Sequence, residues 1–155
     1  MANYYPAEIC LNGHVISSCR NNIEKYCSIC GAKTISICPS CQVPIRGELN
    51  TDIIIVKDYV LPAYCFNCGQ PFPWTQSKID AINELMELDE QLSVDEKSYI
   101  SQNINSIISD TPKTKVVATK FGILFKKAGK ITASAIRDIL VDIASESAKK
   151  IIFGE

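Results

Sequence analysis

The cysteines and the single histidine are confined to the first part of the chain. All eight cysteines and His14 lie between Cys10 and Cys68. Six of the cysteines form three C-x-x-C pairs, and a fourth pair is Cys10 with His14 in the string CLNGH. Four pairs supply the eight donors that two tetrahedral zinc sites require. The sequence therefore predicts two Zn²⁺ ions held by Cys10, His14, Cys27, Cys30, Cys38, Cys41, Cys65 and Cys68.

The expected cellular compartment of the chain favours metal ligation by the cysteines over disulfide bonds. The start of the chain, MANYYPAEIC, lacks the basic and apolar regions of a secretory signal. We therefore expect a cytoplasmic protein without a membrane span, in a reducing environment where C-x-x-C pairs bind metals. A thioredoxin-like redox role is disfavoured, because none of the pairs sits in a βαβ pattern.

Two pairings of the ligands remain open. The residues between Cys30 and Cys38, GAKTISI, have a strand pattern that separates these cysteines by roughly 20 Å. Ligands of one zinc ion lie within about 4 Å of each other. The sequential pairing joins Cys10/His14 to Cys27/Cys30 and Cys38/Cys41 to Cys65/Cys68, which makes each half a self-contained zinc ribbon. We favour it over the crossed pairing, which would give a RING-like cross-brace by joining Cys10/His14 to Cys38/Cys41 and Cys27/Cys30 to Cys65/Cys68.

Local sequence supports the turns that these sites need. Gly31 and Gly69 follow C-x-x-C pairs, and Gly13 lies between Cys10 and His14, where glycine tolerates the turn dihedral angles. Cys19 could replace His14 as a ligand, but its spacing from Cys10 is too wide for a knuckle. We expect Cys19 to be a free thiol beside Arg20.

The predicted metal sites are structural rather than catalytic. A catalytic zinc keeps one position open for water, whereas here four protein donors are available for each ion and seven of the eight are thiolates. The sequence also lacks H-E-x-x-H, G-x-S-x-G and P-loop motifs. We therefore expect a protein that is not an enzyme, with no catalytic residues and no cofactor besides zinc.

The chain is predicted to have an α+β fold in two domains. Residues 1–74 form a β-rich double zinc-ribbon domain, with strands expected at 32–37, 53–56 and 59–62. Residues 75–155 form a helical domain, in which 75–110 is a helical hairpin and 113–153 contains the basic and C-terminal helices.

Several signals place the helix boundaries. Thr75 or Ser77 is expected to cap the first helix, after prolines that end the ribbon domain. The string SVDE, starting at Ser93, predicts a capping box with Glu96. A break is expected near Gly129, and the apolar stripe from Ile131 to Phe153 predicts one last helix.

The distribution of charged residues indicates whether the partner is a protein or a nucleic acid. Residues 1–74 carry five basic and five acidic side chains, so seven thiolates make the zinc-loaded domain net negative. This negative charge argues against binding to a nucleic-acid backbone and favours a protein partner. Nucleic-acid binding through Lys33, Arg46, Lys57 and the six lysines of 113–130 is the alternative, and an enzyme or redox sensor using Cys19 is a third hypothesis.

The helical domain also has a simpler interpretation. The stretch 113–130 could meet a membrane or nucleic acid, but we expect its apolar face to pack on the protein while its lysines stay in water. The acidic block 75–112 can complement it, within one chain or across a dimer. The wide apolar stripe of the last helix favours a homo-oligomer.

The ordered motifs carry a family resemblance. The strings ICLNGHVIS, YCSICGAKTISICPSCQVPIRGE, YCFNCGQPFPWT and DIASESAKKI resemble a bacterial double zinc-ribbon family of unknown function, the domain of unknown function 2321 family. The resemblance covers most of the chain and implies a small cytoplasmic metal-binding protein. It implies no activity. Cys10, His14 and the three C-x-x-C pairs match the family pattern, and Cys19 does not belong to it.

Overall fold

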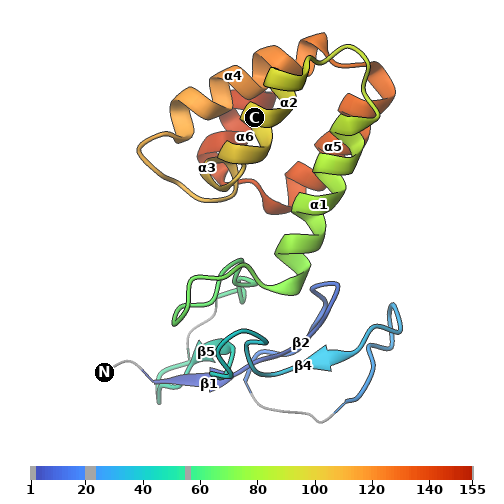
Figure 1. Ribbon diagram of the computed structural model, residues 1–155. Helices are drawn as coiled ribbons and strands as arrows, with labels where there is room; N and C mark the ends of the chain where they lie inside the picture. Colours follow the sequence, from blue (N-terminus) through green and yellow to red (C-terminus); the bar gives the residue numbers. More distant parts are fainter. Residues whose placement is uncertain (1–2, 20–23, 55–56, 155) are drawn as a thin grey trace. The chain divides into compact units, whose positions relative to one another are not determined.

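The computed structural model describes residues 3–19, 24–54 and 57–154. The chain divides into two compact units, Met1–Ser77 and Lys78–Glu155, called here the ribbon unit and the helical unit. Short antiparallel strands make up the first unit and helices dominate the second, so the predicted α+β class is confirmed (Figure 1). The boundary falls inside the helix Pro73–Glu87, so this helix contributes residues to both units.

The strands of the ribbon unit form two small antiparallel sheets. The strands are β1 Tyr4–Pro6, β2 Glu8–Cys10, β3 Val15–Ser17, β4 Thr34–Ile35 and β5 Arg46–Leu49. One sheet has two strands in the order β1-β5, and the other has three in the order β3-β2-β4. Ile9 pairs with Ile35 and Cys10 with Thr34, so Cys10 at the end of β2 lies opposite β4.

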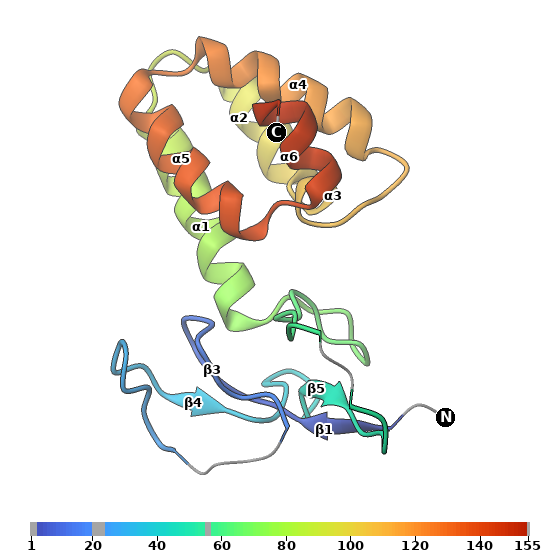
Figure 2. The same cartoon turned by 180° about the vertical axis from the view of Figure 1, so that it is seen from behind.

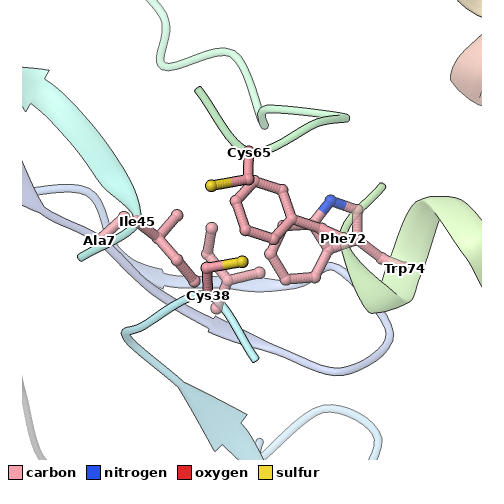
Figure 3. Close-up of a cluster of buried hydrophobic side chains, with 7 residues drawn as sticks. Ala7, Cys38, Ile45, Cys65, Phe72 and Trp74 are labelled. Atoms are coloured by element: carbon pink, nitrogen blue, oxygen red, sulfur yellow. The ribbon is translucent and has the colours of Figure 1, made fainter. Parts of the chain in front are cut away.

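A small apolar cluster lies beside these sheets. Phe72 and Trp74 stack with their ring centroids 4.8 Å apart, and Trp74 Nε1 donates to the carbonyl of Pro62 at 2.9 Å. Figure 3 shows these rings next to the sulfur-bearing side chains of two cysteines. The buried members are Ala7, Ile9, Cys38, Ile45, Cys65, Phe72 and Trp74. A cluster of this size buries little apolar surface, so other bonds must contribute to the stability of this unit.

Two predicted strands are wrong. Ile53 and Ile54 are 74% and 90% exposed and lie outside any strand, while Ile55 and Val56 fall outside the described residues. Residues 59–62 are also irregular. The physical reason is that β1 pairs with β5, so the apolar run at 53–54 has no partner strand to hydrogen-bond. The predicted strand at 32–37 is reduced to Thr34–Ile35.

The first helix starts earlier than the sequence indicated. Helix α1 spans Pro73–Glu87, and the carbonyl of Phe72 accepts from the backbone N–H groups of Thr75 and Gln76, both at 3.0 Å. Proline at the first helical position costs no hydrogen bond, because that N–H would have no partner within the helix. Thr75 and Ser77 therefore lie inside the helix, and their expected capping role is wrong.

The next helices follow the predicted signals more closely. Helix α2, Val94–Asn103, has the predicted capping box: Ser93 accepts from the Glu96 backbone, and Glu96 accepts from the Ser93 backbone. The chain breaks at Ile104 before the short helix α3, Asn105–Ile108. Helix α4 spans Thr114–Lys127 and α5 spans Lys130–Ile143, so the break expected near Gly129 is confirmed.

The single last helix predicted for Ile131–Phe153 is wrong. The chain leaves helical geometry at Ala144, whose ψ is 146°, and restarts as α6, Glu146–Phe153. Ser145 explains the break, because its side chain accepts from the Ala148 backbone at 3.2 Å as a cap. Its own backbone N–H donates to the Ile107 carbonyl at 2.9 Å, which anchors the turn against the end of α3.

The helical unit is built around apolar side chains from several helices. Phe121 of α4 is 1% exposed, and Phe125 packs near Phe121 and Phe153 with centroid distances of 5.8 and 6.1 Å. Helix α4 contacts α6, which lies beside it in Figure 2. The fully buried residues from other helices include Ile82, Ile107 and Leu140. Among the described residues, no helix combines the length and the apolar character that crossing a bilayer requires.

The basic stretch packs as the simpler interpretation predicts. Val117, Phe121 and Leu124 are buried, while Lys126 and Lys127 are exposed at the end of α4. Lys127 Nζ lies 2.8 Å from Glu96 Oε1, so one lysine of the basic stretch pairs with the acidic block inside the same chain. This exposed pair contributes little to stability.

Candidate metal centres

The first cluster joins the CLNGH turn to the first C-x-x-C pair. The ligand atoms of Cys10, His14, Cys27 and Cys30 all lie within 4.8 Å of one another. Cys10 Sγ is 3.4 Å from His14 Nδ1 and 3.7 Å from Cys30 Sγ. Cys27 Sγ is 3.7 Å from His14 Nδ1, so the imidazole presents Nδ1 to the sulfur atoms.

The second cluster joins the remaining two C-x-x-C pairs. Cys38, Cys41, Cys65 and Cys68 have their sulfur atoms within 4.8 Å of one another. Cys38 Sγ lies 3.8 Å from Cys68 Sγ, and Cys41 Sγ lies 3.7 Å from Cys65 Sγ. None of these distances is compatible with a disulfide, whose S–S length is about 2.05 Å.

The four pairs are grouped in sequence order. The crossed grouping is not seen: Cys27/Cys30 share a cluster with Cys10/His14, and Cys65/Cys68 share one with Cys38/Cys41. A zinc–sulfur bond of about 2.3 Å gives a regular tetrahedron with sulfur–sulfur edges of about 3.8 Å. The observed edges of 3.7 and 3.8 Å match this value, so both clusters could hold a four-coordinate metal ion.

The three C-x-x-C turns share one backbone pattern. In each, the N–H of the first cysteine donates to the carbonyl five residues on, and the N–H four residues on donates back to that cysteine's carbonyl. These bonds are Cys27–Ala32 and Gly31–Cys27, Cys38–Val43 and Gln42–Cys38, and Cys65–Gln70 and Gly69–Cys65, at 2.8 to 2.9 Å. The repeated turn brings both sulfur atoms of a pair to the same side.

This turn needs a left-handed backbone at its fifth residue, directly after the second cysteine. The φ angles are +74° at Gly31, +72° at Gly69 and +66° at Gln42. The sequence indicated the two glycines but not Gln42, because a glutamine gives no composition signal for this conformation. Its side chain donates from Nε2 to the Pro39 carbonyl at 3.2 Å across the turn.

The CLNGH turn is closed by different bonds. The Cys10 N–H donates to the His14 carbonyl at 3.0 Å, and the Gly13 N–H donates to the Cys10 carbonyl at 2.9 Å. Gly13 has φ +91°, and a Cβ there would lie 3.1 Å from Trp74 Cβ. Glycine is therefore required for both the dihedral angle and the close approach.

Hydrogen bonds to sulfur favour thiolates at one cysteine of each cluster. The Ala32 backbone N–H and the Asn12 side chain lower the pKa of Cys30 to about 6. The Val43 backbone N–H lowers the pKa of Cys41 to about 7, with further help from Asn67. Both thiols lose their protons more readily than an ordinary cysteine, which favours metal ligation.

Another cysteine in each cluster is shifted the opposite way. Burial raises the pKa of Cys10. The Gln70 backbone N–H acts to lower the pKa of Cys68, but burial and the three neighbouring thiols outweigh it and raise that pKa to about 11. Packed thiolates repel one another, so complete deprotonation of a cluster requires a cation at its centre. A divalent metal ion supplies that charge.

Cys19 lies outside both clusters. Its Sγ is 4.0 Å from the Ser17 hydroxyl, and its backbone N–H donates to that oxygen at 3.4 Å. Neither group of ligand atoms includes it. The proposed neighbour Arg20 falls outside the described residues.

The aromatic residues near the second cluster have two different roles. Phe72 and Trp74 are buried in one cluster with Cys38 and Cys65 and provide hydrophobic cover. Phe66 is 53% exposed and lies under the Arg46 guanidinium, whose carbon is 3.9 Å from the ring centroid. It stacks with a cation at the surface instead of entering the core.

The fold and the two clusters define a class of small α+β proteins with two candidate metal-binding clusters and a helical C-terminal part. A family model described as "Uncharacterized protein conserved in bacteria (DUF2321)" matches residues 3–152, so the chain belongs to that family. The resemblance inferred from the cysteine motifs is thereby confirmed. No curated protein and no solved structure matches the chain.

Proposed function

We propose that the chain is a non-catalytic zinc protein in which two structural Zn²⁺ ions stabilise a double ribbon that binds a protein partner. The proposed binding of two Zn²⁺ ions rests on the donor set, which is seven sulfurs and one imidazole nitrogen in two groups of four. Soft donors in tetrahedral groups favour zinc over magnesium or calcium, which take oxygen ligands. Thiolate donors also require a reducing compartment, which supports a cytoplasmic location.

A structural role follows from the closed coordination. Four protein donors fill a tetrahedral shell, so neither ion would have a free position for a water or a substrate. Thiolates also transfer electron density to the metal and weaken it as a Lewis acid. The ions would therefore act on folding rather than on chemistry.

The exposed apolar side chains of the ribbon unit support a protein partner. Tyr26 is 65% exposed and Ile29 is 74% exposed, both at the first C-x-x-C turn. Phe66 projects from the last such turn at 53% exposure. Exposed apolar side chains on turns that bound metal ions would hold rigid suit a protein interface, and the net negative charge of the loaded ribbons disfavours a nucleic-acid backbone.

The experiment compares the zinc-loaded chain with two surface variants. Ile29→Ser and Phe66→Ser change exposed turn residues that are not metal ligands, so both should keep two zinc ions per chain. Partners captured by the native chain should be lost with at least one variant and kept with Leu88→Ser, a control on an exposed position of the helical unit (77% exposed). Tight DNA or RNA binding with a steep salt dependence in a filter-binding titration would contradict the proposal.

The helical unit is proposed to dock to the partner or to self-associate. Helix α5 exposes Ile131 at 89% and Val141 at 42%, although Ile136 and Leu140 on the same helix are buried. These exposed positions can add contact area to an interface. The mass of the purified protein in solution distinguishes a monomer from a homo-oligomer.

A further inference from the structure

We propose that Cys30 is an oxidation site through which peroxide releases the metal ion of the first cluster and leaves the second cluster loaded. The inference rests on the proposed zinc loading and adds a modification site to it. It depends on three observations: the exposure of Cys30, the position of a second thiol next to it, and the different surroundings of the other cluster.

Cys30 is the most accessible of the described cysteines. It is exposed, whereas Cys10 and Cys27 in the same cluster are buried. The whole turn around it, residues 28–31, is also exposed. The turn that carries Cys30 is therefore open to a small oxidant from solvent, whereas the buried Cys10 and Cys27 are shielded.

The equivalent positions in the second cluster are better covered. Cys41 and Cys68 occupy the same place in their turns as Cys30, and both are only half-exposed. They pack against the apolar cluster that contains Phe72 and Trp74, which is drawn in Figure 3. Apolar cover limits the access of peroxide to sulfur. The second cluster, with four sulfurs where the first has three sulfurs and one imidazole nitrogen, therefore serves as an internal comparison.

A second thiol stands where it can complete the reaction. Cys10 Sγ lies 3.7 Å from Cys30 Sγ, so a modest approach of the two sulfurs suffices for a bond. Asn12 Nδ2 donates to Cys30 Sγ at 3.4 Å, which orients the sulfur toward this side of the cluster. A resolving cysteine beside an accessible one is the usual arrangement of a peroxide-sensitive pair.

The reaction is a two-electron oxidation of these two thiolates. The Cys30 thiolate attacks hydrogen peroxide, the S–O bond forms, the O–O bond breaks, and the released hydroxide takes a proton to give water. The Cys10 thiolate then attacks the Cys30 sulfenic acid, the S–S bond forms, the S–O bond breaks, and hydroxide again leaves as water. Two thiolates, one peroxide and two protons thus give one disulfide and two waters.

The metal ion leaves because its shell loses half its donors. After the disulfide forms, only His14 and Cys27 remain as ligands in the first cluster. Two donors do not hold zinc against competition from water and chelators. The turns of residues 10–14 and 27–31 then lose the ion that fixes them, while the second cluster keeps its four sulfurs.

The test uses the full chain loaded with zinc, after elemental analysis has established two ions per chain. Hydrogen peroxide is added stepwise with a chromogenic zinc chelator present, and thiols are then mapped by differential alkylation and mass spectrometry. The expected result is release of one ion, a Cys10–Cys30 disulfide, and four reduced thiols in the second cluster. Simultaneous loss of both ions, or earlier oxidation of Cys41 or Cys68, would overturn the proposal. A starting metal count other than two would instead overturn the zinc assignment.

Two variants separate the role of Cys30 from general fragility. Cys30→His replaces the oxidisable sulfur by an imidazole and keeps four donors, so it should retain both ions at peroxide doses that release one from the native chain. Cys19→Ser removes the thiol outside the clusters and should leave the release curve unchanged. Loss of the response in Cys19→Ser would show that Cys19, and not Cys30, senses the oxidant. If Cys30→His does not bind two zinc ions, the map of oxidised thiols in the native chain still shows whether Cys30 is the residue that is oxidised first.

Discussion

The two units of the chain have very different sources of stability. The ribbon unit has strands of two to four residues and one small buried cluster, to which the cysteines themselves contribute. The helical unit contains whole helices of up to fourteen residues and buries large apolar side chains such as Phe121, Ile107 and Leu140. On the proposed metal loading, a fold with little apolar core is specified by a few metal ligands, whereas a helical fold depends on many separate packing contacts.

Metal removal should produce the largest difference between the two units. Each proposed zinc site would contribute on the order of 10 kcal/mol to folding, so a chelator at neutral pH should unfold the ribbon unit. The helical unit contains neither metal cluster and should keep much of its helical signal. Far-UV circular dichroism and thiol alkylation measure the two effects. Full thiol protection after the metal is removed would contradict this expectation.

A core truncation in the helical unit should destabilise that unit and leave the ribbon unit with its metal ions. Phe121→Ala removes a side chain that is 1% exposed and should cost about 3–5 kcal/mol of unfolding free energy. Val116→Ala, on the same helix at 67% exposure, should change stability by less than about 0.5 kcal/mol. Denaturant titration measures both. Zinc content should remain at two ions in each variant, and a loss of zinc in Phe121→Ala would show that the units do not fold separately.

Asp89 should make the helical unit sensitive to acid. Its Oδ2 accepts from the Gly129 N–H and its Oδ1 from the Gln91 N–H, both at 2.8 Å. Burial acts to raise the pKa of Asp89, but hydrogen bonds from Gly129, Gln91, Thr132 and Leu92 outweigh it and hold the pKa below its usual value of 3.8. The bonds from Gly129 and Thr132 join the carboxylate to the start of α5, where a negative charge is favoured, and those from Gln91 and Leu92 join it to the segment between α1 and α2.

The sign of this pH effect follows from the lowered pKa. The carboxylate contributes its full stability above the unfolded pKa, and the contribution is lost as the pH falls through the folded value. Asp89→Asn should cost about 2 kcal/mol at neutral pH and should flatten the acid dependence of unfolding. Asp138→Asn is a control on an exposed helix position. An unchanged acid profile in Asp89→Asn would contradict the assignment.

Glycine substitutions in the turns that carry the ligands should have the smallest effects. Gly31 has φ +74° with open space around a Cβ, so Gly31→Ala should cost about 1 kcal/mol through backbone strain alone. Gly13→Ala should cost more, because its Cβ would also press on Trp74 and Leu61. Thermal unfolding of the zinc-loaded variants measures the difference. Equal costs at the two positions would show that the close approach to Trp74 is not maintained in solution.

The sequence contained most of what defines the metal sites. Regular spacing put the ligands in pairs, and the extended pattern between Cys30 and Cys38 indicated that these pairs belong to different clusters, as the structure places them. The Ser93 capping box and the break near Gly129 were also predictable, because both depend on local residue chemistry. Local signals of this kind act without knowledge of the tertiary fold.

The errors arose where tertiary contacts decide the outcome. The apolar run at Ile53 and Ile54 satisfies the strand pattern, but β1 pairs with β5, so the run lies at the surface. The stripe from Ile131 to Phe153 suggested one helix, but the Ser145 backbone bond to Ile107 anchors a break that no local periodicity reveals. Gln42 adopts a left-handed conformation because the repeated turn imposes it, against the preference of its own side chain.

The most direct test of the account is X-ray absorption at the zinc edge, combined with elemental analysis of the purified chain. Two bound zinc atoms should appear per chain, with an averaged shell of sulfur at about 2.3 Å and a minor nitrogen contribution from His14. A shell containing an oxygen donor, or a preparation with oxidised cysteine pairs and no zinc, would contradict the claim that two saturated metal centres stabilise the ribbon unit.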